Sequence, residues 1–158
     1  MKNSTLIKNE LKTLDLKGQI LFGSIPLNIL SKVYQDGRVL GLIVEHLIDF
    51  EFSNIHRVSK ESHPYDFISD NGEKLECKTA INKLDPYPSY MKGKGRVYDQ
   101  QKHLEYLNSI DGFILVTSLE LPNLKIIWLD KNNQIFWKNG IPAKSIPFSV
   151  ITTIFNNA

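Results

Sequence analysis

Residues 63–80 read HPYDFISDNGEKLECKTA, and this stretch decides the fold. Two short runs rich in β-forming residues flank Asp70-Asn71-Gly72, a turn signal typical of a β-hairpin. A two-residue turn would set Phe67 opposite Glu76 and mix polar with apolar side chains on both faces. A three-residue loop, with Gly72 in the left-handed conformation, sets Phe67 opposite Leu75 instead. Because a slip by one residue would move a whole apolar set into water, the sequence predicts this second register.

The predicted register sorts the hairpin side chains onto two faces. One face holds Phe67, Leu75, Tyr65 and Cys77, and the other holds Asp66, Glu76 and Lys78. Two carboxylates directly opposite each other repel, so their pairing favours a hard divalent cation shared between them. A lysine beside that ion could orient or deprotonate a water held near a phosphate. The alternative is a solvated charged face that merely keeps an exposed sheet soluble.

Hydrophobic periodicity predicts the other elements. Helices are expected over residues 4–15, behind a Ser4 cap, and over 26–34, 38–50 and 98–107. In the 38–50 helix the expected buried face consists of Val39, Leu42, Ile43, His46, Leu47 and Phe50, and Glu45 interrupts the apolar stretch. A strand buried on both faces is expected over 112–118, and two further strands over 124–129 and 134–137.

The composition is that of an ordinary globular protein and does not identify a function. The 158 residues, 42% of them apolar, are enough for one core, so we expect a single domain over 1–158. A formal net charge of +2 does not by itself indicate a nucleic-acid partner. A lone cysteine, Cys77, and the lack of an apolar leader or a membrane-length apolar run lead us to expect a reducing, cytoplasmic setting and no membrane.

A local excess of positive charge follows the hairpin. Between residues 78 and 97, only Asp85 opposes the cations Lys78, Lys83, Lys92, Lys94 and Arg96. Such an excess suits a phosphate-rich partner, and Asn82 could read a base edge. The alternative is an exposed, flexible loop.

Pro64-Tyr65-Asp66, followed ten positions after Asp66 by Glu76-Cys77-Lys78, resembles the PD-(D/E)xK motif of the restriction-endonuclease-like nuclease superfamily. It departs from the motif in that Tyr65 separates the proline from the aspartate. Residues 38–118 also resemble the family in layout: a helix with an embedded Glu45, a hairpin with the motif, a basic loop, a helix and a buried strand.

The resemblance implies an α/β fold, with a central mixed β-sheet flanked by helices, and a metal site. Asp66 and Glu76 would bind Mg²⁺ together with the Cys77 carbonyl, and Lys78 would activate the attacking water. Glu45 is a candidate third carboxylate, and Gln101 a candidate polar helper on the following helix. No organic cofactor is implied.

We therefore expect a type II restriction endonuclease that cuts a short site in double-stranded DNA as a homodimer. The homodimer follows from the chain's size and from the resemblance, because palindromic cleavage calls for two copies related by a twofold axis. One alternative is a junction-resolving or repair nuclease of the same superfamily. The other is a non-catalytic DNA-binding module with this fold.

Overall fold

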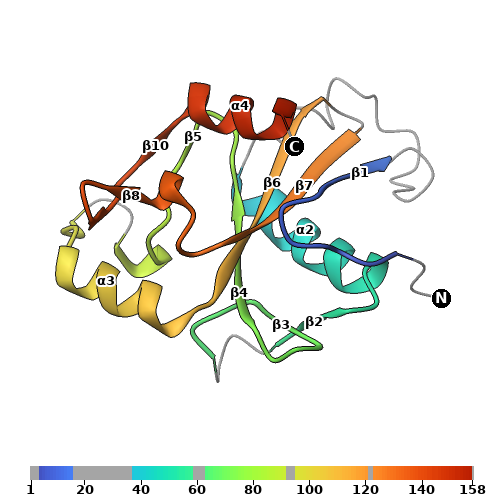
Figure 1. The fold of residues 1–158 in the computed structure, drawn as a ribbon, viewed down its shortest axis with the longest axis horizontal. Coiled ribbons are helices and arrows are strands. Elements are labelled where there is room, and N and C mark those ends of the chain that lie inside the picture. The colour runs from blue at the N-terminus through green and yellow to red at the C-terminus, as the bar shows by residue number, and fades with distance from the viewer. Residues whose placement is uncertain (1–3, 16–36, 59–62, 92–94, 121–122, 158) are drawn as a thin grey trace.

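Six strands form one mixed sheet in the order β1-β7-β6-β4-β3-β2 (Figure 1). Their bounds are β1 Leu11–Asp15, β2 Ile55–Arg57, β3 Phe67–Ser69, β4 Lys74–Thr79, β6 Gly112–Glu120 and β7 Asn123–Asp130. Strands β4 and β6 are parallel, and the other neighbours in this sheet are antiparallel. This computed structural model describes residues 4–15, 37–58, 63–91, 95–120 and 123–157. The expected α/β class with a central mixed sheet is confirmed.

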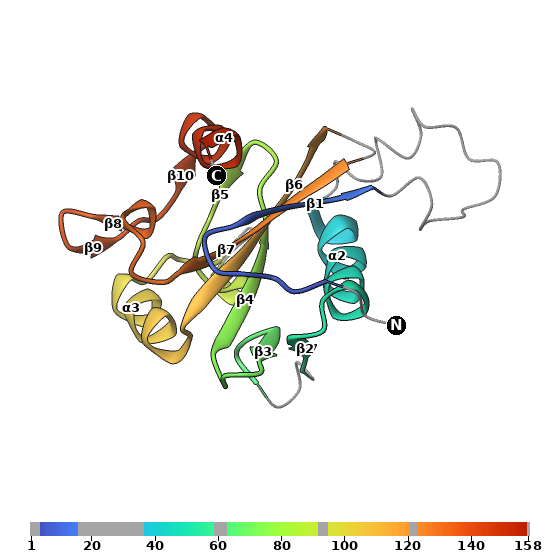
Figure 2. The same ribbon diagram turned by 45° about the vertical axis from the view of Figure 1, so that its right-hand side comes forward.

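Helices cover both faces of the sheet (Figure 2). Helix α2 (Gly37–Glu51) lies on one face, and α3 (Gln100–Ser109) and α4 (Phe148–Asn157) lie on the other. Two short sheets complete the fold. In one, β5 (Lys83–Leu84) pairs with β10 (Ile146–Pro147), and in the other β8 (Trp137–Lys138) pairs with β9 (Ile141–Pro142). Among the described residues, no helix has the length and apolarity needed to cross a membrane.

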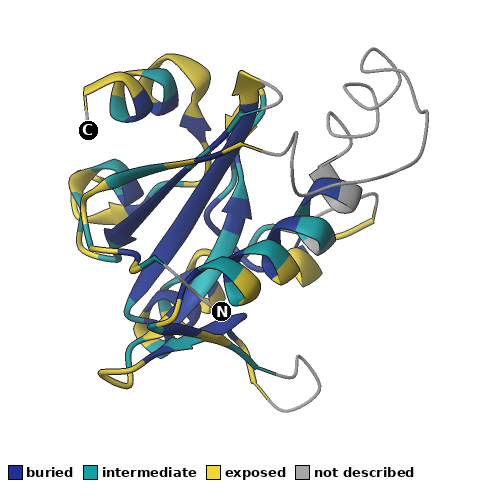
Figure 3. Cartoon of the chain, turned by 90° about the vertical axis from the view of Figure 1, so that its right-hand side faces the viewer, coloured by how far each residue is buried: buried dark blue, intermediate teal, exposed yellow. Residues whose placement is uncertain are grey.

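Strand β6 is the centre of the core, as its continuous apolar sequence predicts. Its residues from Gly112 to Ser118 are all buried, and Figure 3 shows it as a dark blue strand between the two layers. Side chains alternate along it. Ile114 and Val116 pack into the cluster under α2, whereas Phe113 and Leu115 pack into the cluster under α3 and α4.

The predicted helix over 38–50 is confirmed as α2, and its predicted buried face is only partly right. Ile43 and Leu47 pack, partly buried, against the core, whereas the burial of Val39 and Leu42 lies outside what the structure describes. The fully buried side chains are Leu40, Val44 and Ile48, while His46 is exposed and Phe50 is 67% exposed. Apolar residues occupy so much of the helix circumference that two phases fit the periodicity. The buried phase includes Glu45, because Arg57 donates to its carboxylate at 3.2 and 3.3 Å.

The hairpin has the predicted register. Phe67 pairs with Leu75 and Ile68 with Lys74, and Gly72 adopts a φ of 81° in the three-residue loop. One detail of the prediction is wrong: Tyr65 does not share a face with Cys77. The Cys77 N–H donates to the Asp66 side chain at 2.9 Å, and Tyr65 packs into the cluster beneath α3 while Cys77 packs against the other cluster.

Replacing Gly72 with alanine should destabilise the protein by about 1 kcal/mol, because a Cβ is strained at this positive φ even though no atom lies within 4 Å of it. Gly41→Ala is the matched control. Gly41 is helical and equally open, so its replacement should stabilise by roughly 0.5–1 kcal/mol. Urea unfolding measures the change in the free energy of unfolding for each variant. Changes of the same sign would contradict the hairpin geometry.

Some of the other predicted helices and strands are confirmed and some are wrong. The helix expected over 4–15 is wrong: Asn9 has a φ of 65°, which breaks a helix, and β1 pairs with β7 instead. The segment 26–34 lies outside the described residues. The helix expected over 98–107 is α3, which begins at Gln100 because the Asp99 side chain caps it. The expected strand over 134–137 is mostly a 3-10 turn, Gln134–Phe136.

Candidate functional site

The structure brings Asp66, Glu76 and Lys78 together. Glu76 and Lys78 point to the same side of β4, and Asp66 lies at the start of the preceding strand. The Lys78 Nζ lies 2.6 Å from the Glu76 Oε1, with both side chains nearly buried at 10% and 13% exposure. Asp66 is 5% exposed. This burial does not fit the alternative of a solvated charged face.

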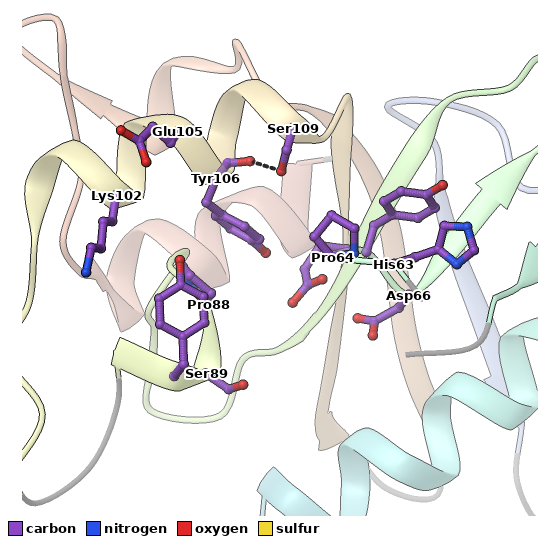
Figure 4. A pocket seen from close by; sticks show the side chains of 12 residues that line it. His63, Pro64, Asp66, Pro88, Ser89, Lys102, Glu105, Tyr106 and Ser109 are labelled. Atoms are coloured by element: carbon purple, nitrogen blue, oxygen red, sulfur yellow. Dashed lines mark hydrogen bonds between the residues drawn. The ribbon is translucent and has the colours of Figure 1, made fainter. Parts of the chain in front are cut away.

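A pocket of about 470 Å³ opens beside these side chains. Three segments line it: the hairpin, the 3-10 turn Ser89–Met91 with Pro88 before it, and α3. In Figure 4, Asp66 and His63 lie at one end, Lys102 and Glu105 at the other, and the ring of Tyr106 projects from α3 between them. Asp66 and Glu76 therefore face a space large enough for a substrate group.

Burial and neighbouring charges both shift the pKa values of groups in the site. Burial raises the pKa of Glu76, and the nearby Asp66 carboxylate raises it further, while Lys78 acts in the opposite direction. Burial also raises the pKa of the Cys77 thiol well above its usual range, and Asp66, Glu45 and Glu76 add to that increase. These shifts show that the carboxylates are close enough to interact, so a cation among them would be stabilised.

The chemistry of the donors fits a magnesium ion. No group of three or more His, Cys, Asp or Glu side chains within the described ranges is arranged to hold a metal. Magnesium, however, is usually bound through one or two carboxylates, with water and substrate phosphate oxygens completing its ligands. The close, buried carboxylates of Asp66 and Glu76 supply that pair.

Glu45 lies near the site but has a partner of its own. It is 6% exposed and forms an ion pair with Arg57, whose side chain is 29% exposed. Glu45 lies on α2, which packs in the cluster that Cys77 contacts, on the side of β4 opposite to Glu76. This pairing gives Glu45 a structural role.

The structure describes only some of the candidate DNA-binding residues, and these have different partners. Lys83 is exposed and pairs with Asp85 at 3.3 Å, and the Arg96 guanidinium donates to the Ser89 carbonyl at 2.8 Å. Asn82 is exposed, whereas Lys92 and Lys94 lie outside the described residues. Gln101 is exposed, donates to Glu105, and does not line the pocket.

Sequence reasoning missed Lys102 and Tyr106, both of which line the pocket. A signal was present, because Lys102, Glu105, Tyr106 and Ser109 follow the spacing of one helix face. What the sequence does not reveal is which segment that face meets.

Comparison of the chain with protein-family models, curated proteins and solved structures finds no match. A function is therefore inferred from the residues of the site and their geometry.

Proposed function

We propose that this chain is a magnesium-dependent endonuclease that hydrolyses phosphodiester bonds in double-stranded DNA. The observation that carries the proposal is the buried trio of Asp66, Glu76 and Lys78 at the edge of the pocket. Keeping three charged groups largely away from water is costly, with the Glu76 side chain only 13% exposed. Closely paired charges in a cleft are typical of functional sites.

Each member of the trio has a distinct chemical task in this proposal. Asp66 and Glu76 contribute carboxylate oxygens, and the backbone carbonyl of Cys77 is a further candidate ligand. A bound magnesium ion would supply charge neutralisation and a more acidic water. Lys78, held beside Glu76, would orient the attacking water and stabilise the negative charge that develops on the phosphate.

The order of elements supports the resemblance noted in the sequence. Helix α2 with Glu45, the hairpin with the motif, α3 and the buried strand β6 follow one another along the chain. We therefore propose the activity of a type II restriction endonuclease. Two copies related by a twofold axis would cut the two strands of a short palindromic site, since DNA symmetry is matched by protein symmetry. We propose the cytoplasm as its compartment.

Incubation of the full chain with plasmid DNA and Mg²⁺, followed by sequencing of the ends, tests the proposal. Cleavage at one short sequence supports a restriction enzyme, and EDTA should abolish it. Cleavage of a four-way junction but not of a plain duplex would favour the junction-resolving alternative. Binding without cleavage would leave the non-catalytic DNA-binding module.

Arg96→Gln should weaken DNA binding to all sequences and reduce the slope of log affinity against log salt by about one unit, because one phosphate contact is lost. Arg96→Lys keeps the charge and should retain the slope. Lys12→Ala is a second control, since Lys12 lies on the edge strand β1, which β7 and β6 separate from β4. Titrations at several salt concentrations measure the slopes. An unchanged slope in Arg96→Gln would exclude a phosphate contact.

A further inference from the structure

The ring of Tyr106 projects from α3 into the pocket (Figure 4). It is 6% exposed and lines the pocket with Asp66 and Glu76 (Figure 4). The Lys78 Nζ lies over its ring, 5.8 Å from the centroid. Tyr106, Lys78 and Glu76 therefore form one packed group, although Tyr106 lies on a different layer of the fold.

The hydroxyl of Tyr106 is buried, and within the described residues it meets no acceptor in good hydrogen-bond geometry, although the Glu76 carboxylate is near enough for a weak hydrogen bond. A buried polar group without a partner costs free energy, and native proteins retain few of them. Glu76 is close to this hydroxyl but uses its Oε1 to accept from Lys78. Because Glu76 is already engaged with Lys78, the Tyr106 hydroxyl can donate to a stronger acceptor that enters the pocket.

The pocket indicates what that acceptor is. Around Tyr106, the carboxylates of Asp66, Glu76 and Glu105 outnumber the ammonium groups of Lys78 and Lys102 by one. A divalent cation would reverse the sign of this balance and make room for one negative charge. A phosphodiester carries that charge and exposes two non-bridging oxygens, which accept hydrogen bonds but donate none.

We propose that the Tyr106 hydroxyl donates a hydrogen bond to a non-bridging oxygen of the scissile phosphate, and so acts as a further catalytic residue. This inference rests on the proposed nuclease function. Tyr106 acts as a donor only, because a tyrosine phenol keeps its proton at neutral pH. It orients the phosphate and stabilises the charge that grows on its oxygens, and no bond to Tyr106 is formed or broken.

Tyr106→Phe tests the proposal, because it removes only the hydroxyl. Since that hydroxyl makes at most a weak hydrogen bond to Glu76 in the free protein, the melting temperature should change little. Single-turnover cleavage should slow by about a hundredfold or more, as it does when one donor to a developing oxyanion is lost. Tyr98→Phe is the matched control. Its hydroxyl lies 3.0 Å from the His103 Nδ1 and outside the pocket, so this variant should melt roughly 2–4 °C lower and cleave bound DNA at the wild-type rate.

Two results would overturn the proposal: a Tyr106→Phe variant that cleaves like the wild type, or one that loses as much thermal stability as Tyr98→Phe. If the wild type itself cleaves no DNA, the proposed nuclease function fails separately. Tyr106 is then judged with inorganic phosphate in the presence of calcium. Phosphate should raise the melting temperature of the wild type more than that of Tyr106→Phe, and equal shifts would overturn the donor role.

Discussion

Replacing Lys78 with alanine is expected to slow single-turnover cleavage of bound DNA by about 10²–10⁴-fold, the loss typical of removing an acid-base or charge-stabilising group. DNA binding measured in calcium should stay nearly intact. The two measurements separate the possible roles, because a lysine that only anchored DNA would weaken binding and leave the chemical step unchanged.

The alanine variant needs a partner experiment, because Lys78 is also structural. Breaking a buried ion pair costs about 3–5 kcal/mol, and both members of this pair are largely buried. Lys78→Gln keeps a hydrogen-bond donor for Glu76 but carries no charge, so it should melt higher than Lys78→Ala while cleaving as slowly. If both variants are folded and cleave at the wild-type rate, the proposed site is wrong.

The hairpin was predictable because its determinants are local. Residues 63–80 combine a period-two apolar pattern with a glycine at the one turn position that requires a positive φ. The register then follows, and with it the proximity of Asp66 to Glu76 and Lys78. Only Tyr65 departs from the pattern. The residue pairs of β3 and β4 reach no further than Phe67, and beside them the Asp66 side chain accepts a hydrogen bond from the Cys77 N–H.

The rest of the site depends on contacts between segments that are distant in sequence. Tyr106 reaches Glu76 because the buried side of α3, with Leu107 and Ile110, packs in the same cluster as Phe113 of β6. Nothing in residues 100–109 alone specifies that packing. The same limit explains β1, whose pairing with β7 prevails over a helical apolar spacing, and the phase of α2, which depends on its packing against the core.

Asp66→Asn should raise the Mg²⁺ concentration that gives half-maximal cleavage. Loss of an outer-shell partner typically weakens metal binding by about 10–100-fold, so the loss of a direct ligand should shift this midpoint by at least that much. The amide retains an oxygen that can accept from the Cys77 N–H, so the fold should persist. Titrating cleavage with Mg²⁺ measures the shift in the reacting enzyme. Calorimetric titration with Ca²⁺ measures the change in metal binding without cleavage.

Asp70→Asn is the matched control, because it removes one negative charge from the same hairpin. Asp70 lies on the exposed turn, 2.6 Å from the His56 Nε2, and does not line the pocket. Solvent and salt screen its charge from the metal, so its midpoint should match that of the wild type. A general loss of negative potential would shift both variants alike, whereas a lost ligand shifts only Asp66→Asn.

Lys78→Gln should do the opposite of Asp66→Asn, with a lower rate at saturating Mg²⁺ and a midpoint that is not raised. If the two variants do not differ in this way, the proposal that Asp66 binds the metal while Lys78 activates the water is wrong.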